Sequence, residues 1–85
     1  MQKVLITAGA SGIGYALAEA FYAEGYKVWV IDISEEDLTK CPKNWEQTKL
    51  DVSDENAMMD LFNEIKNKWG GLDVVCANAG TAGPT

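Results

Sequence analysis

The feature that most constrains the fold is a glycine-rich loop between an apolar run and an amphipathic stretch. The run is Val4–Ile6, the loop reads Gly9-Ala10-Ser11-Gly12-Ile13-Gly14, and the stretch continues from Ile13 to Phe21. A second apolar run ends at Asp32, eighteen positions after the last glycine. This order predicts a strand, a turn that cradles a phosphate, a helix, and a second strand that ends in a carboxylate.

Four segments are expected to form strands. Lys3–Thr7 and Lys27–Ile31 are short apolar runs rich in β-branched residues, which is typical of strands buried on both faces of a parallel sheet. Glu46–Leu50 is more polar and suits an edge strand, and Leu72–Ala77 is again apolar. Strands that alternate with helices through short connections predict an α/β, Rossmann-type parallel sheet in the order 3-2-1-4, with helices on both faces.

Three helices are expected between these strands. Ile13, Leu17 and Phe21 recur every fourth position and predict the apolar side of the first helix, which Gly25 would end. Ser34 is the expected N-cap of a short second helix. The third helix is expected to begin after a capping signal at Ser53. Its apolar stripe consists of Met58, Leu61, Phe62, Ile65 and Trp69.

The third helix is expected to cover one face of the sheet alone, because the first two crossovers return on the other face. One helix is too narrow to cover a face of a sheet of four strands. We therefore expect partly exposed apolar side chains on the strands and an unpaired edge on the fourth strand. The strand segments concerned are Val4–Ile6, Val28–Ile31 and Val74–Cys76.

Composition excludes several classes of protein. Eighty-five residues make one domain or part of one, and 47% hydrophobic residues are typical of a folded chain. A net charge of -6 argues against a nucleic-acid partner. Two cysteines without any histidine predict neither a disulfide framework nor a zinc site. We see no signal peptide or membrane-spanning segment, so the expected compartment is the cytoplasm.

The loop contains the residue types that bind a diphosphate. Gly9, Gly12 and Gly14 let the backbone turn sharply and approach the ligand, while the amides of Ser11 and Ile13 can donate to phosphate oxygens. A glycine-rich loop alone is equally consistent with an ordinary tight turn. The strand, helix and strand around it favour a coenzyme loop.

Two acidic positions follow strands at the same edge of the expected sheet. Asp32 can accept hydrogen bonds from both ribose hydroxyls of an adenosine, and its charge would repel a 2′-phosphate, so we expect NAD to be preferred over NADP. Neither Ser11 nor Ile33, which would both border the coenzyme, offers a cation for that phosphate. Asp51, followed by Val52, suits a cap at a strand end as well as an adenine contact.

Four motifs in this order resemble the N-terminal half of the short-chain dehydrogenase/reductase family, and they span nearly the whole chain. They are Thr7–Gly14, Asp32, Asp51-Val52 and Asn78-Ala79-Gly80. The resemblance implies that Thr7 opens the coenzyme loop, that Asp32 selects NAD, and that Asp51 and Val52 contact adenine. It also implies that Asn78, Ala79 and Gly80 support the sheet and border the coenzyme ribose.

The sequence departs from the family pattern at two places, and we expect both changes to be tolerated. Ala8 stands where the family usually has glycine, directly after the threonine. Ala77 stands before Asn78 where the family has another asparagine.

The family's catalytic tyrosine and lysine are absent from this sequence. Tyr15, Tyr22 and Tyr26 are the only tyrosines, and none has a lysine four residues later. No catalytic residue and no metal ligand is therefore assigned. Residues 1–85 are interpreted as an incomplete NAD-binding domain of an oxidoreductase that transfers hydride between NAD(H) and an alcohol or carbonyl substrate. Alternatives are a non-catalytic dinucleotide-binding or regulatory module and an interaction protein that retains only the fold.

We predict that the 85-residue chain is marginally stable or self-associated, and that it gains order when the C-terminal half of a parent enzyme is supplied. Its expected partners are therefore the dinucleotide and either further copies of itself or that half. Analytical ultracentrifugation combined with thermal unfolding tests this prediction. A stable, cooperatively unfolding monomer at micromolar concentration would contradict it.

Overall fold

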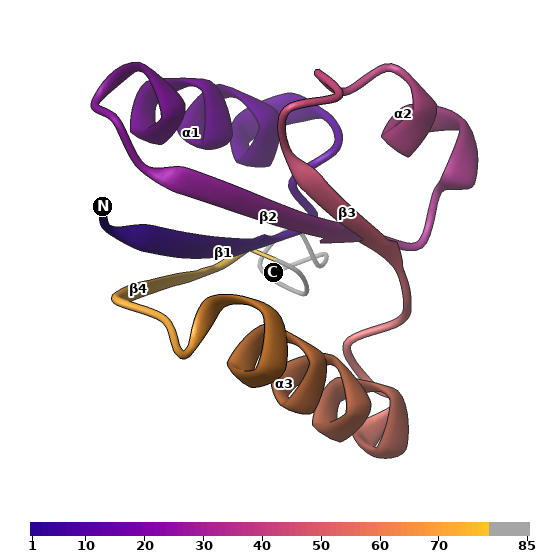
Figure 1. Ribbon diagram of the computed structural model, residues 1–85. Coiled ribbons are helices and arrows are strands. Elements are labelled where there is room, and N and C mark those ends of the chain that lie inside the picture. Colours follow the sequence, from indigo (N-terminus) through magenta and orange to yellow (C-terminus); the bar gives the residue numbers. More distant parts are fainter. Residues whose placement is uncertain (79–85) are drawn as a thin grey trace.

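The computed structural model describes residues 1–78, in which strands and helices alternate along the chain (Figure 1). The elements are β1 (Lys3–Thr7), α1 (Gly12–Ala23), β2 (Lys27–Asp32), α2 (Glu35–Thr39), β3 (Glu46–Lys49), α3 (Glu55–Trp69) and β4 (Val74–Ala77). All of the predicted strands and helices are present. The fourth strand begins two residues later than predicted, at Val74 and not at Leu72.

The four strands are parallel and lie in the order β3-β2-β1-β4, as predicted. Thr7, at the end of β1, is level with Ile31 of β2 and with Ala77 of β4. This register brings the carboxyl ends of three strands to one edge of the sheet. Asp32 is the last residue of β2, and the glycine loop and Asn78 follow the ends of β1 and β4. This is the edge at which ligands lie in open α/β folds.

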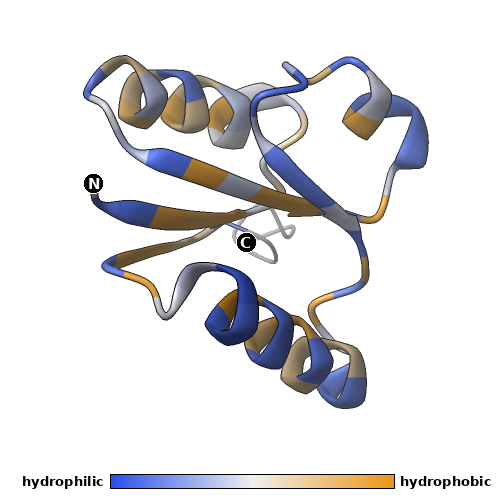
Figure 2. Ribbon diagram, in the orientation of Figure 1, coloured by the Kyte–Doolittle hydropathy of each residue, from blue (hydrophilic) through white to orange (hydrophobic). Residues whose placement is uncertain are grey.

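Helices cover both faces of the sheet, with α1 and α2 on one side and α3 on the other (Figure 1). Alternate side chains of each buried strand supply the two cores: Val4 and Ile6 pack on the α1 side, whereas Leu5 packs against α3. The hydropathy colouring shows hydrophobic residues along both central strands (Figure 2). The predicted placement of the helices is confirmed.

The buried side of α1 differs from the prediction. Gly14 and Ala18 are its buried residues, Leu17 and Phe21 are only partly buried, and Ile13 is 77% exposed. The cause is close packing, because small residues facing the sheet let the helix axis approach the strands. Ile13 lies in the first turn, beside the glycine loop. The periodicity correctly indicated a helix, and Leu17 and Phe21 pack against the core as predicted, whereas Ile13 does not.

The predicted exposure of the two central strands was wrong. Val4–Ile6 and Val28–Ile31 are almost completely buried, with at most 2% of any side chain accessible. Two large rings explain the difference: Trp29 of β2 meets Trp69 of α3 edge to face, with 5.0 Å between centroids. Aromatic side chains of this size bury far more area than aliphatic ones, so one helix shields both strands.

Of the three strand segments that were predicted to be partly exposed, only that of the edge strand β4 contains an exposed apolar side chain. Val75 of β4 is 51% exposed, while its neighbours Val74 and Cys76 pack against the core on the α1 side of the sheet. On α3, Leu61 and Ile65 are buried as predicted, but Phe62 is 43% exposed because it lies at the margin of the stripe.

The two later helices have side-chain caps. The Ser34 hydroxyl accepts a hydrogen bond from the Asp37 amide at 3.2 Å, as predicted for α2. For α3 the cap is Asp54, one residue after the predicted Ser53, and its carboxylate accepts from the Ala57 amide at 3.1 Å. Both helices also carry acidic residues in the first turn, where they offset the positive end of the helix dipole.

Candidate functional site

The glycine loop is packed tightly between β2 and α1. The Gly9 amide donates to the Ile31 carbonyl oxygen at 3.1 Å, and a Cβ atom at Gly9 would lie 2.7 Å from Cγ1 of Val30. A Cβ atom at Gly14 would overlap the carbonyl oxygen of Ala8. Gly9 and Gly14 are therefore required for packing, because any larger residue would push the loop off the sheet or the helix off the loop.

Gly12 has a different role. Its φ of +61° is in the left-handed region, and a Cβ atom there would face open space. α1 begins at this residue, and its N-cap, Ser11, makes no side-chain capping hydrogen bond. The first turn also contains no acidic residue. The start of α1 thus combines amides without intrahelical acceptors with an uncompensated dipole, which is the arrangement that binds anions.

Ala8 occupies the position at which the related family usually has glycine. Its φ is +53°, so an alanine is held in the left-handed conformation. That conformation costs an L-residue roughly 1–2 kcal/mol. The loop keeps its shape despite this cost because Gly9 and Asp32 hold both sides of the turn.

The Asp32 carboxylate links the end of β2 to the loop. Its Oδ2 atom accepts from the Ala10 amide at 3.2 Å, and its Oδ1 atom accepts from the Ser34 amide at 3.0 Å. A carboxylate offers about four acceptor positions, so both oxygens retain capacity for ligand hydroxyls. Neither ion pair found among residues 1–78 involves Asp32, and its charge is therefore uncompensated.

A pocket of about 470 Å³ opens beside Asp32. It is lined by Ala8, Ser11, Ile31, Asp32, Ile33, Leu50, Asp51, Val52 and Ser53. Five of the predicted site residues thus meet in one hollow, although they come from three separate connections. The other four lining residues, Ala8, Ile31, Leu50 and Ser53, were not predicted. The sequence signal available for Ser53 is its position two residues after an aspartate at a strand end.

Asp51 forms a tight turn that leads into α3. Its Oδ1 atom accepts from the Ser53 amide at 2.9 Å and from the Ser53 hydroxyl at 2.8 Å. These hydrogen bonds, the backbone one first, lower the pKa of the exposed Asp51 carboxyl below its ordinary value. The capping role that the sequence left open is therefore present in the structure.

The end of β4 is tied to the end of β1 through Thr7. The Thr7 hydroxyl accepts from the Asn78 amide at 2.7 Å and donates to the Cys76 carbonyl at 3.4 Å. Asn78 is thereby fixed beside the glycine loop. Ala79 and Gly80, which were also predicted to border the coenzyme, lie outside the described residues.

Thiol and metal chemistry are not favoured within residues 1–78. Both cysteines are free. Burial raises the pKa of the Cys41 thiol above its ordinary value, and the Asp32 and Asp37 carboxylates raise it further, which disfavours a reactive thiolate. That part of the chain contains no group of three or more potential metal ligands, and none of its helices is long and apolar enough to cross a membrane.

The fold and the site have the features typical of dinucleotide-binding modules: a parallel sheet with a glycine loop that opens a helix and an acid at the end of the second strand. Comparison with known sequences identifies the family of the chain. The family model for short chain dehydrogenases matches residues 2–85. The chain belongs to this family of oxidoreductases, whose members use nicotinamide dinucleotides.

Two relatives illustrate the similarity. The uncharacterized oxidoreductase YxbG of Bacillus subtilis is 41% identical over 93% of this chain and 32% of its own length. The 15-hydroxyprostaglandin dehydrogenase [NAD(+)] of Bos taurus is 34% identical over 89% of this chain and 32% of its own length. The chain thus spans about a third of the length of these relatives.

Solved structures agree with the fold. A short chain dehydrogenase from Bacillus anthracis superimposes with a TM-score of 0.84 at 27% identity, over 92% of this chain and 34% of its own. The ligand-free aldohexose dehydrogenase of Thermoplasma acidophilum gives a TM-score of 0.83 at 29% identity, over 93% of this chain and 29% of its own.

We predict that Gly14→Ala destabilises the fold more than Gly12→Ala does. The first change forces a methyl group against the Ala8 carbonyl and should cost about 2 kcal/mol or more. The second places its methyl group in open space and adds only backbone strain of about 1 kcal/mol. Urea unfolding of the two variants measures the difference. An equal or reversed order would contradict the packing described for Gly14.

We also predict that Ser53→Ala raises the pKa of Asp51 part of the way to its ordinary value, because the hydroxyl hydrogen bond is lost and the amide one remains. Since the folded-state pKa is depressed, this carboxylate contributes stability above its unfolded pKa, and the contribution is lost as pH falls through the folded pKa. A titration followed by the carboxyl ¹³C shift measures the change. Ser34→Ala is the control, and an unchanged Asp51 pKa in Ser53→Ala would count against the assigned cause.

Proposed function

We propose that this chain is the coenzyme-binding part of an NAD-dependent oxidoreductase that transfers hydride between NAD(H) and an alcohol or carbonyl substrate. The observation that carries the proposal is the pocket beside Asp32, which joins the uncapped start of α1 to the carboxyl ends of β2 and β3. Bound NAD would supply the hydride acceptor.

The residues present fit the coenzyme. The amides at the start of α1, around Gly12 and Ile13, would hold the diphosphate, and the free acceptor positions of Asp32 would hold the adenosine ribose. Ile33 and Val52 supply apolar surface for adenine, and Asp51 offers its remaining carboxylate oxygen to the same pocket. On this basis Asp51 serves as both a turn-forming residue and an adenine contact.

NAD should be preferred over NADP because of charge. A 2′-phosphate would lie beside the Asp32 carboxylate, whose charge no lysine offsets within residues 1–78. Ile33, the next residue along the pocket wall, is apolar and exposed. The bovine relative, whose name specifies NAD(+), gives independent support for this preference.

The chemical step would depend on residues outside this sequence. It contains no tyrosine followed four residues later by lysine, so the chain alone should bind coenzyme without turning over an alcohol. Within residues 1–78, β4 pairs with β1 alone, and Val75 is half exposed. This edge supports the expected self-association or pairing with a further segment of a parent enzyme.

We predict that Asp32→Asn narrows the preference for NAD over NADP by about 1 kcal/mol or more, roughly fivefold, because it removes a like charge beside the phosphate. Asparagine is preferable to alanine here because its side-chain oxygen can keep one of the hydrogen bonds to Ala10 and Ser34. Ile33→Lys is the complementary change and should raise NADP affinity by supplying a cation.

Titration calorimetry with both coenzymes measures these affinities, and Ile33→Met is the uncharged control. Unchanged discrimination in Asp32→Asn and in Ile33→Lys would contradict the placement of the ribose.

A further inference from the structure

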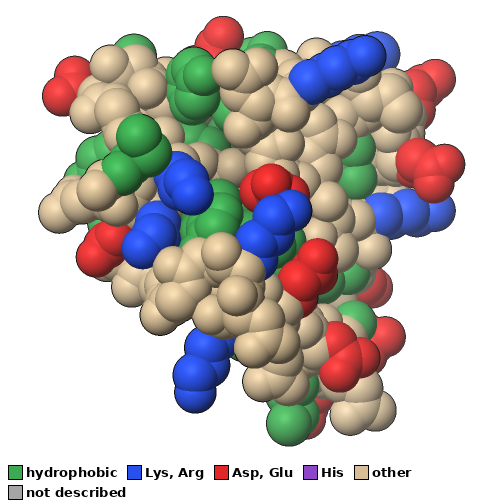
Figure 3. Space-filling model, viewed as in Figure 1, with side chains coloured by type: hydrophobic (Ala, Val, Ile, Leu, Met, Phe, Trp, Pro, Cys, Tyr) green, Lys and Arg blue, Asp and Glu red, His purple; other side chains and the backbone are tan. Residues whose placement is uncertain are grey.

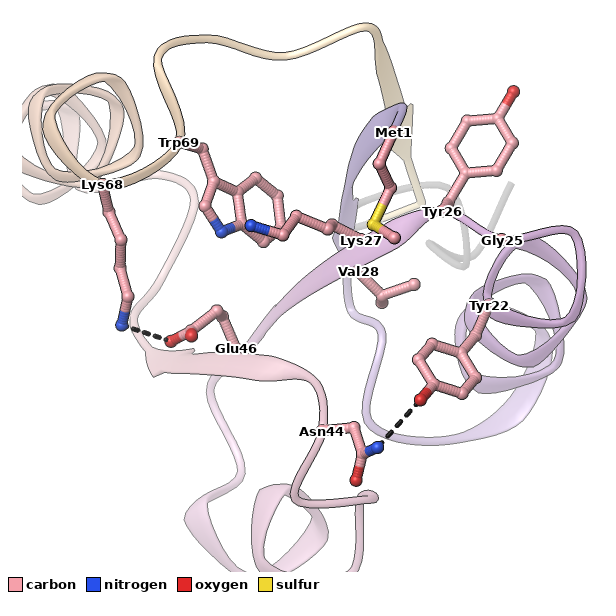
Figure 4. Close-up of a pocket in the computed structure, with 10 residues that line it drawn as sticks. All are labelled: Met1, Tyr22, Gly25, Tyr26, Lys27, Val28, Asn44, Glu46, Lys68 and Trp69. Carbon is pink, nitrogen blue, oxygen red and sulfur yellow. Dashed lines mark hydrogen bonds and ion pairs between the residues drawn. The ribbon is translucent and has the colours of Figure 1, made fainter.

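A second hollow lies at the opposite edge of the sheet, where β2 and β3 begin and α3 ends (Figure 4). This groove encloses about 710 Å³, and none of its lining residues also lines the pocket beside Asp32. Its volume is in the range of small-molecule sites. The proposed coenzyme function leaves the groove unused.

Among the lysine and glutamate side chains of the groove, one positive charge has no ion-pair partner. Lys68 is paired with Glu46, with 3.0 Å between the ammonium nitrogen and the carboxylate oxygen. Lys27 lies over the Trp69 ring, 5.8 Å from its centroid, and takes part in neither ion pair of residues 1–78. Figure 4 shows the Lys27 side chain extended toward Trp69. The groove is therefore locally cationic on a chain whose net charge is -6.

Apolar surface surrounds this charge. Val28 and Trp69 are buried behind the groove, and the Tyr22 ring is 42% exposed beside it. The Tyr22 hydroxyl is already fixed by the Asn44 amide at 2.8 Å, so the ring offers a flat and oriented face. The space-filling view shows lysine and acidic side chains around a hydrophobic patch near the middle of the face that it displays (Figure 3).

We propose that this groove binds a small planar carboxylate. The carboxylate pairs with the Lys27 ammonium, and the ring packs against the exposed face of Tyr22. A single negative charge is favoured over a dianion such as phosphate, because the Glu46 carboxylate lies in the same groove and repels further negative charge. The apolar lining favours an aromatic body over a small ion such as acetate.

Equilibrium dialysis of the 85-residue chain with 2-naphthoate tests the proposal. The uncharged control ligand is 2-naphthalenemethanol, which has the same two rings. We expect naphthoate to bind roughly threefold to fivefold more tightly than the alcohol, as for a partly exposed ion pair. Lys27→Met should remove that difference. Lys40→Met, which alters an exposed lysine at the end of α2, should retain it.

Several outcomes would overturn the proposal: no binding of naphthoate, equal binding of the acid and the alcohol to the unaltered chain, or an unchanged preference in Lys27→Met. The first two do not depend on the folding of any variant. Displacement of naphthoate by NAD would assign the probe to the pocket beside Asp32 and would also overturn it. Displacement by inorganic phosphate at similar concentration would show a general anion site in place of a site for planar carboxylates.

Discussion

The carboxylate of Asp32 is the interaction on which the candidate site depends. It accepts hydrogen bonds from the loop after β1 and from the residue before α2, so one side chain holds two separate connections against the end of β2. Without it, the Ala10 and Ser34 amides would lose acceptors at the sheet edge. In the proposed function the same group recognises the coenzyme ribose, so structural support and coenzyme specificity would be combined in one residue.

The parallel register of the strands explains why the glycine loop, Asp32 and Asn78 lie at the same edge of the sheet. Because β1, β2 and β4 end level with one another, their following loops share one edge of the sheet, and the helices start or turn there. Two of those helices neutralise their own N-termini with side chains, whereas α1 does not. The anion-binding capacity of the fold is therefore concentrated beside Asp32.

Local patterns were sufficient to predict the order of the strands, the helices and most of the site. Apolar runs and glycine spacing depend only on neighbouring residues, and so Ser11, Asp32 and Ile33, which line the pocket, could be predicted from them. The adenine role of Asp51 and Val52 was implied only by the family resemblance. The burial of the two central strands could not be predicted from local patterns, because it depends on the contact between Trp29 and Trp69, which are far apart in the sequence. The full burial of Gly14 and Ala18 in α1 was missed for a related reason: these small residues contribute little hydrophobicity, yet they set how closely the helix packs.

The most direct test of coenzyme binding is a ¹H–¹⁵N NMR titration of the 85-residue chain with NAD. The largest shifts should occur at the amides of residues 11–14 and at those of Asp32, Ile33, Asp51 and Val52. The amides of Lys27 and Lys68, at the opposite edge of the sheet, should change little. An absence of shifts, or shifts confined to the groove around Lys27, would contradict the assignment of the dinucleotide to the pocket beside Asp32.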